Sequence, residues 1–215
     1  MWMRRRKPEQ QAQPSQPKVQ PPAVASVSQE TDRPRVYAFI DSQNLNIGTQ
    51  RFGWKMNWVK FREWLAERYN VEKAYMFIGY LPENEDLYEK MHQAGYLVVL
   101  KPTFDVTRPR PEEEKGDEEA KPVKGNIDAD LVLWAMKEIG NYQKAIIVSG
   151  DGDFYSLVEY LEHKGRLSHL LTPSGYYSQL YNPYEKYIVR LDHFRHELAY
   201  HDYRRRPGQG KGAAS

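Results

Sequence analysis

Short apolar runs are separated along the chain by stretches in which apolar residues recur every three or four positions. Runs of this length, rich in Val, Ile, Leu and aromatic residues, are typical of strands that are buried in a sheet. They predict strands at residues 36–40, 71–80, 96–101, 145–148, 167–171 and 187–191.

Helical spacing of apolar residues predicts a helix after most of these strands. Phe61, Trp64 and Leu65 share one helical face, and Gly95 and Gly165 stand where two of the helices are expected to end. The helices are expected at residues 58–69, 85–95, 127–140, 154–164 and 192–200. Strands alternating with helices predict βαβ units and an α/β fold of three layers, α/β/α, with a mainly parallel central sheet.

Composition changes at both ends of the chain and once inside it. Residues 8–34 are rich in Gln, Pro and Ser and contain no aromatic residue, a composition that cannot offset the entropy cost of ordering. We therefore expect a disordered basic arm over 1–34, a folded domain over 35–200 and a disordered basic tail over 201–215. Residues 105–123, with three prolines and two runs of Glu, are expected to form a mobile acidic insertion.

The net charge of +2 hides an uneven distribution. Residues 1–33 hold six basic and three acidic residues, and residues 204–215 hold four basic and no acidic residues. Of the 31 basic and 29 acidic residues in the chain, 21 and 26 are therefore left in between, a net charge of −5. The basic ends could hold phosphates by electrostatic attraction, or they could simply keep the protein in solution.

The absence of cysteine excludes disulfides and thiolate metal sites, and it agrees with a reducing, cytoplasmic location. No stretch of about 18 apolar residues is present, so we expect no membrane span. The basic residues at the start of the chain are not followed by an apolar segment, so we do not expect a secretory signal.

Acidic residues follow two of the predicted strands. Asp41 comes directly after the strand at 36–40, and Asp151 and Asp153 come shortly after the strand at 145–148. In a parallel sheet the carboxyl ends of the strands form the edge where ligands bind. We therefore expect these carboxylates to lie together, although Asp153 could instead cap the helix that follows it.

Another candidate, Asp128, lies in the first turn of the helix predicted at 127–140. Its spacing from Leu131 and Ala135 places Asp128 on the inward face and Asp130 outward. The helix dipole also favours a carboxylate at this position, so capping alone could explain one of the two aspartates.

Carboxylates crowded together repel one another and raise one another's pKa unless a cation neutralises them. Without cysteine or a paired-histidine motif, oxygen ligands favour Mg²⁺ or Mn²⁺. Such an ion can activate water for in-line hydrolysis of a phosphodiester. Asn44, Lys124 and Ser149 are the candidate substrate-binding residues, although Asn44 could be a cap or turn residue and Lys124 a solvated surface charge.

Together, three segments of the chain resemble the NYN domain, a branch of the PIN-like nuclease superfamily that includes the LabA-like bacterial proteins. The resemblance covers about residues 35–191. The segments are Phe39-Ile40-Asp41-Ser42-Gln43-Asn44, Lys124-Gly125-Asn126-Ile127-Asp128 and Ile147-Val148-Ser149-Gly150-Asp151-Gly152-Asp153-Phe154.

The resemblance implies a small α/β sandwich with an acidic, Mg²⁺-binding cleft that cuts RNA. Carried over by position, Asp41, Asp128 and Asp151 would form the metal-binding core, with Asp153 and Asn44 supporting it. The acidic insertion is a departure from the family, because its charge would repel RNA if it lay over the cleft. So is a group of tyrosines that could stack on bases or pack half-buried: Tyr176, Tyr177, Tyr181, Tyr184 and Tyr187.

We therefore expect a Mg²⁺- or Mn²⁺-dependent endoribonuclease with a catalytic site at Asp41, Asp128, Asp151 and Asp153, acting on single-stranded RNA. The alternative is a non-catalytic RNA-binding or scaffold module, although a pure binder of polyanions gains nothing from clustered negative charge. An Asp-based phosphotransfer or nucleotide-sugar enzyme is a third interpretation, and the absence of a nucleotide-binding glycine pattern disfavours it. A homodimer is one possible oligomeric state.

Overall fold

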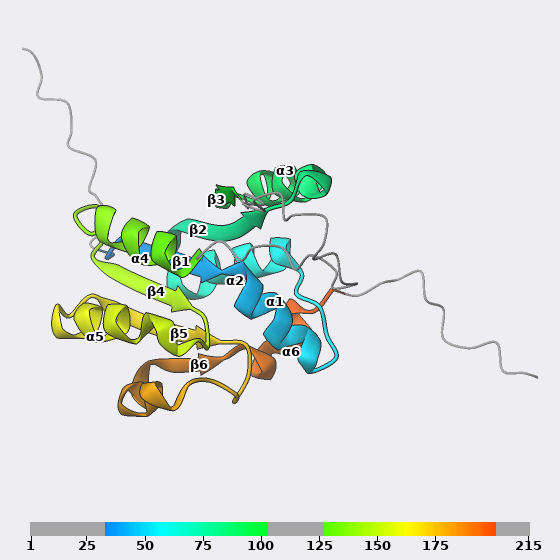
Figure 1. Cartoon of the computed structure of the whole chain (residues 1–215). Coiled ribbons are helices and arrows are strands. Elements are labelled where there is room, and N and C mark those ends of the chain that lie inside the picture. Colours follow the sequence, from blue (N-terminus) through cyan, green and yellow to red (C-terminus); the bar gives the residue numbers. More distant parts are fainter. Residues whose placement is uncertain (1–32, 103–126, 201–215) are drawn as a thin grey trace, which may run out of the picture. The chain divides into compact units, whose positions relative to one another are not determined.

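A six-stranded sheet with every strand parallel runs through residues 33–102 and 127–200, the part of the chain that the computed structural model describes (Figure 1). Each predicted strand is present, with its ends within one residue of the prediction. The strands are β1 (Val36–Asp41), β2 (Val71–Tyr80), β3 (Leu97–Pro102), β4 (Lys144–Val148), β5 (Leu167–Thr172) and β6 (Ile188–Arg190).

Helices connect the strands and cover both faces of the sheet, so the predicted three-layer α/β/α class is confirmed (Figure 1). The α-helices are α1 (Ser42–Arg51), α2 (Trp58–Tyr69), α3 (Glu85–Gln93), α4 (Ile127–Lys137), α5 (Tyr155–His163) and α6 (Arg195–Leu198). The 3₁₀ helices are η1 (Pro82–Asn84), η3 (Gly152–Phe154), η4 (Gln179–Tyr187) and η5 (Leu191–Phe194). The predicted insertion at 105–123, the tail at 201–215 and the arm before residue 33 lie outside the described residues.

Helix α1 is the main element that the hydrophobic pattern did not predict. Most of its residues are polar, and only Leu45 and Thr49 are buried, so no apolar stripe marks it. The helix begins instead with a side-chain cap, because Asp41 accepts a hydrogen bond from the backbone N–H of Asn44.

The single helix predicted over 192–200 is wrong. The structure has η5 followed by the four-residue α6, and the backbone then becomes extended at Ala199. Residues near this end pair with the segment before α2: Leu198 accepts a hydrogen bond from Asn57 N–H, and Tyr200 N–H donates one to Lys55. An extended backbone that meets these partners cannot continue as a helix.

Strand residues alternate between two apolar cores, one on each face of the sheet. Val36, Ala38 and Ile40 of β1 pack into one core, and Tyr37 and Phe39 pack into the other. This alternation follows from the two-residue period of a strand. Since both faces are covered, the strand reads as a continuous apolar run in the sequence.

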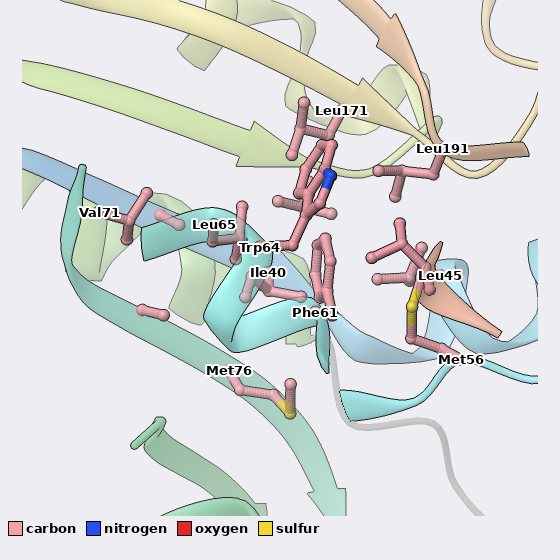
Figure 2. Close-up of a cluster of buried hydrophobic side chains, with 14 of the residues drawn as sticks. Ile40, Leu45, Met56, Phe61, Trp64, Leu65, Val71, Met76, Leu171 and Leu191 are labelled. Carbon is pink, nitrogen blue, oxygen red and sulfur yellow. The ribbon is translucent and has the colours of Figure 1, made fainter. Parts of the chain in front are cut away.

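The first core lies under α1, α2 and α6, and Figure 2 shows part of it. Phe61 and Trp64 of α2 meet Leu45 of α1 and Leu191 beside β6. The second core lies under α4, α5 and η4. The two cores together hold the sheet between two helical layers.

The strand order β3-β2-β1-β4-β5-β6 places the site. From β1 the chain adds β2 and then β3 on one side, and it returns to add β4 on the other side of β1. The order therefore reverses between β1 and β4, where Ile40 pairs with Val148. At such a switch point the loops that follow the two strands diverge and leave room for a ligand.

Candidate functional site

Asp41 is the last residue of β1 and lies at this switch point. Its side chain is buried, and both of its oxygens accept hydrogen bonds. The backbone N–H of Asn44 donates to Oδ1 at 3.0 Å, and the hydroxyl of Ser149 donates to Oδ2 at 3.2 Å. Asp41 is therefore held in one orientation from both strand ends.

Asn44 joins the loops that follow β1 and β4. Its side-chain Oδ1 accepts a hydrogen bond from the backbone N–H of Gly150 at 2.9 Å, while its own N–H donates to Asp41. Sequence reasoning left a choice between a contact with Asp41, a contact with phosphate and a cap. In the structure Asn44 contacts Asp41 through its backbone and ties the second loop through its side chain.

Asp151 follows β4 and organises the turn that leads into α5. Its Oδ1 accepts a hydrogen bond from the N–H of Asp153 at 3.1 Å, and its own N–H donates to Ser149 Oγ at 3.1 Å. The capping side chain at this turn is therefore that of Asp151. The interpretation of Asp153 as the helix cap is wrong, since α5 begins after Phe154 without a side-chain cap and Asp153 is exposed.

The backbone of the Asp151 turn is held from a third segment, η4 and the residue before it. The hydroxyl of the buried Tyr181 donates to the carbonyl oxygen of Asp151, and the N–H of Ser178 donates to the carbonyl of Gly150 at 3.0 Å. Neither contact was expected from the sequence. The only signal was the density of tyrosines between residues 176 and 187, which left stacking and packing open.

Asp128, in the first turn of α4, acts on Asp41 through its negative charge. Burial raises the pKa of Asp41, and the negative charges of Asp128 and Asp151 raise it further, against hydrogen bonds from Asn44 and Ser149 that lower it. Asp128 and Asp151 are thus both close enough to Asp41 to repel its charge.

Asp130, one half-turn from Asp128, belongs elsewhere. Its carboxylate lies 3.0 Å from Lys101 Nζ on β3. The helical spacing predicted that Asp128 lies on the inward face of the helix and Asp130 on the outward face, in agreement with these two positions. Lys124, the remaining candidate from the sequence, lies outside the described residues.

A cleft of about 620 Å³ opens beside these carboxylates. The backbone is close-packed there, because a Cβ on Gly152 would lie 2.5 Å from Ser178 Oγ. The cleft is lined by Asn44, Gly150, Asp151, Gly152, Asp153, Tyr176, Tyr177, Ser178 and Leu180. Of the predicted site residues, Asn44, Asp151 and Asp153 line it directly.

Oxygen donors surround this cleft, and they suit a hard divalent cation. The mutual repulsion at Asp41 is also of the kind that a cation relieves. Within residues 33–102 and 127–200, however, no three Asp, Glu or His side chains lie close enough together to hold a metal ion as they stand. The donor chemistry and charge fit a metal, whereas the spacing of the described side chains would have to shorten to hold one.

None of the helices described is long and apolar enough to cross a membrane. This agrees with the absence of a long apolar stretch in the sequence.

Known proteins share the sequence pattern and the fold of this chain. The model of the NYN domain matches residues 35–188. The low amplitude and bright protein LabA of Synechococcus elongatus is 25% identical over 160 residues, which cover 72% of this chain and 82% of LabA. A crystal structure of a protein of unknown function from Vibrio parahaemolyticus has the same fold, with a TM-score of 0.58, 20% identity, and coverage of 80% of this chain and 99% of that one. Since the family model spans most of its length, the chain belongs to the NYN domain family, a family of PIN-like nucleases.

Proposed function

We propose that the protein is a Mg²⁺- or Mn²⁺-dependent ribonuclease that hydrolyses phosphodiester bonds of RNA in the cleft beside Asp151. One observation carries the proposal. At the switch point of the sheet the carboxylate of Asp41 is held in place by hydrogen bonds, and burial, together with the charges of Asp128 and Asp151, raises its pKa. Burial and nearby negative charge both disfavour the ionised form of this carboxyl, and a bound cation would offset them. Its position in the fold is the one where α/β sheets bind ligands.

The residues have separate roles in this proposal. Asp41, Asp128 and Asp151 would hold the metal, which when bound supplies an activated water and stabilises the charge that develops on the phosphate. Asn44 and Ser149 position the acids, because they connect Asp41 to the loop that carries Asp151. Asp153 is exposed in the cleft lining, where it could contact metal-bound water.

The substrate class in this proposal is single-stranded RNA, and Lys124 is a candidate for contact with its phosphates. The family resemblance supports RNA as the substrate. The absence of cysteine agrees with action in the cytoplasm.

The central experiment is a cleavage assay with the full chain and a fluorescently labelled single-stranded RNA. We expect cleavage with Mg²⁺ or Mn²⁺ and none with EDTA. Asp151→Asn should reduce the rate at least about 100-fold, a typical loss when electrostatic stabilisation of the transition state is removed. The fold should persist, because the amide oxygen can still accept the Asp153 N–H. Unchanged cleavage by this variant would disprove the site.

Helix α4 offers a matched pair of variants that separates the site from the surface. Asp128→Asn and Asp130→Asn make the same chemical change two residues apart, but only Asp128 acts on Asp41, while Asp130 pairs with Lys101. We expect Asp128→Asn to abolish cleavage and Asp130→Asn to leave it within about twofold, since the half-buried Asp130–Lys101 ion pair is remote from Asp41 and such pairs near the surface contribute little. Equal losses in both variants would contradict the role assigned to Asp128.

A non-catalytic RNA-binding module is the second candidate. It is favoured by the hydrogen bonds that already occupy both oxygens of Asp41 and one of Asp151. It is also favoured by the lack of a ready three-ligand group among the described residues. Tight RNA binding without cleavage under any divalent metal would establish this function in place of the first.

A further inference from the structure

Part of the cleft lining is aromatic and has no role in the chemistry proposed above. Tyr176, Tyr177 and Leu180 line the cleft together with Asp151 and Asp153. Tyr176 is 74% exposed, although its ring is large and mostly apolar. Tyr181, by contrast, is fully buried. The tyrosines of this region therefore divide into packing residues and at least one presented to solvent.

The exposed ring of Tyr176 is braced from behind. It stacks on Phe52, at the end of α1, with ring centroids 5.5 Å apart and an angle of 29° between the planes. The guanidinium of Arg51 lies 5.7 Å from the centroid of Tyr176. Phe52 stacks on the ring and the guanidinium of Arg51 lies over it, yet 74% of Tyr176 is exposed. Much of the ring is therefore still accessible, with a positive charge over it.

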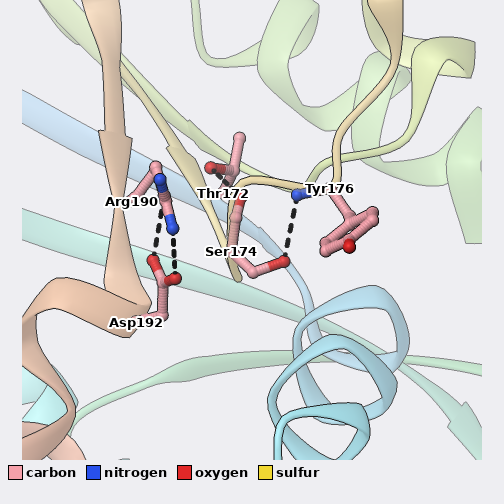
Figure 3. A network of polar contacts seen from close by, with 5 residues as sticks. All are labelled: Thr172, Ser174, Tyr176, Arg190 and Asp192. Carbon is pink, nitrogen blue, oxygen red and sulfur yellow. Dashed lines mark hydrogen bonds and ion pairs between the residues drawn. The ribbon is translucent and has the colours of Figure 1, made fainter.

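The loop that carries Tyr176 is also fixed, as Figure 3 shows. The N–H of Tyr176 donates to Ser174 Oγ at 3.2 Å, and the hydroxyl of Thr172 donates to the carbonyl of Ser174 at 3.0 Å. A Cβ on Gly175 would lie 3.0 Å from Arg190 Cζ, so the loop rests directly on that side chain. A ring held in this way loses little freedom when a ligand stacks on it.

The backbone of the loop that carries Tyr176 lies next to the acidic turn. A Cβ on Gly150, the residue before Asp151, would be 3.5 Å from the carbonyl oxygen of Tyr176 and 3.4 Å from Tyr177 Cβ. The two loops are therefore in contact, and Tyr176 and Asp151 line the same cleft. A cleft of about 620 Å³ is large enough for a nucleotide-sized ligand.

An exposed aromatic ring with a cation over it is suited to a nucleobase and its phosphate. Bases stack on exposed aromatic side chains without regard to sequence, and arginine adds a charge for the backbone. Only an unpaired base offers its face, so a duplex would not fit. We propose that Tyr176, braced by Phe52 and accompanied by Arg51, is a stacking platform for one base of single-stranded RNA beside the bond that is cleaved. The ligand class rests on the proposed function.

The test measures binding apart from cleavage. Full-length protein carrying Asp151→Asn is titrated into fluorescein-labelled oligouridine RNA with Mg²⁺ present, and Kd is read from anisotropy. We expect Tyr176→Ala to weaken binding about tenfold and Tyr176→Phe to bind within about twofold of the parent. Tyr160→Ala is the matched control, because Tyr160 on α5 is also exposed and has Lys164 Nζ 5.6 Å from its ring, but it does not line the cleft.

A series of single abasic positions in the RNA identifies the stacked base. One position should weaken binding to the parent protein about as much as Tyr176→Ala does, and it should weaken binding no further in that variant. Any of three results would overturn the platform. They are equal binding by the parent and Tyr176→Ala, fully additive effects of Tyr176→Ala and every abasic position on the binding free energy, and no RNA binding at all.

The cleavage assay on protein without Asp151→Asn reports separately on the ribonuclease. If the protein cleaves RNA and Tyr176→Ala binds RNA as tightly as the parent, the stacking site is disproved and the ribonuclease activity is supported. If Tyr176→Ala and one abasic position weaken binding non-additively but the protein cleaves no RNA, the stacking site is supported and the ribonuclease activity is disproved.

Discussion

At the carboxyl end of β1, Asp41 contributes to the fold and to the candidate site at the same time. One oxygen caps α1, and the other accepts the Ser149 hydroxyl from the loop after β4. As a structural element it is costly, because it is buried beside two other carboxylates that raise its pKa. A neutral side chain could supply the same cap without that repulsion.

Substituting Asp41→Asn tests whether the charge serves a cation. The amide oxygen keeps the cap on α1, while the buried charge disappears. In EDTA we expect the variant to unfold at a slightly higher temperature than the wild type, because repulsion from Asp128 and Asp151 is removed. With Mn²⁺ only the wild type should gain stability, by about 2.7 kcal/mol when the ion is at 100 times its Kd. Differential scanning calorimetry with and without Mn²⁺ measures both effects, and equal gains by both proteins would argue against a metal at Asp41.

Tyr181 holds the turn after β4 through its hydroxyl, which donates to the carbonyl of Asp151. Tyr181→Phe should cost about 1 kcal/mol of stability, because the part-buried carbonyl of Asp151 loses its hydrogen bond. It should also lower the cleavage rate, as Asp151 is then less firmly placed. The readouts are urea denaturation and the RNA cleavage assay.

Tyr142→Phe is the matched control for this prediction. Tyr142 is buried just before the start of β4, and it does not line the cleft. Its hydroxyl donates to the carbonyl of Ala135 in α4 at 2.9 Å. A similar stability loss with unchanged cleavage is expected there. If the two variants lose activity alike, Tyr181 acts only through global stability.

Among the elements, α1 shows how a segment without an apolar stripe can still be indispensable to a site. It carries Asn44 at one end, and at the other it meets the loop after β5 through Gly48 and Phe52. A Cβ on Gly48 would lie 2.5 Å from Pro173 Cβ and 2.6 Å from its Cγ, so only glycine fits this contact.

Gly48→Ala should therefore force α1 away from the loop that carries Tyr176. Overpacking against a rigid proline ring is expected to cost about 1–3 kcal/mol, more than alanine gains from its better helix propensity. Gly140→Ala is the control, because no atom lies within 4 Å of a Cβ there. Thermal unfolding followed by circular dichroism distinguishes them, and equal melting temperatures would mean that α1 adjusts without cost.

The apolar pattern of the sequence was sufficient to predict some helices and strands but not others. The strands and helix α2 were predicted with bounds within one residue, because buried parallel strands and amphipathic helices have strong apolar patterns. Helix α1 and the last helix depend on a cap and on backbone pairing with residues 55–57, neither of which has a hydrophobic period.

For the whole molecule, charge is the property that bears most on RNA binding. Residues 34–203 carry a net charge of −5, so the excess of basic residues lies near the chain ends. An acidic body with an acidic cleft would repel a polyanion unless other positive charge attracts it. The basic run at residues 4–7 is a candidate for that attraction.

Replacing Arg4, Arg5, Arg6 and Lys7 by Gln in the full chain tests this role. We expect weaker RNA binding and a salt dependence of log K that is shallower by up to about 3, since each phosphate contact on a single strand contributes about 0.7. The melting temperature should not change. Binding and salt dependence equal to the wild type would leave these residues with a solubilising role only.

The sequence by itself determined the strands, most helices, the parallel α/β class and the short list of carboxylates, because each depends on local pattern and on the rule that parallel strands end at one edge. Only the tertiary structure decided which strands are neighbours, since the order β2-β1-β4 is a matter of long-range packing. It alone decided that Asp151, and not Asp153, caps the turn after β4. It alone brought Tyr181 and Tyr176, about 30 residues further along, to the same turn. These contacts join segments far apart in the chain, and no local pattern encodes them.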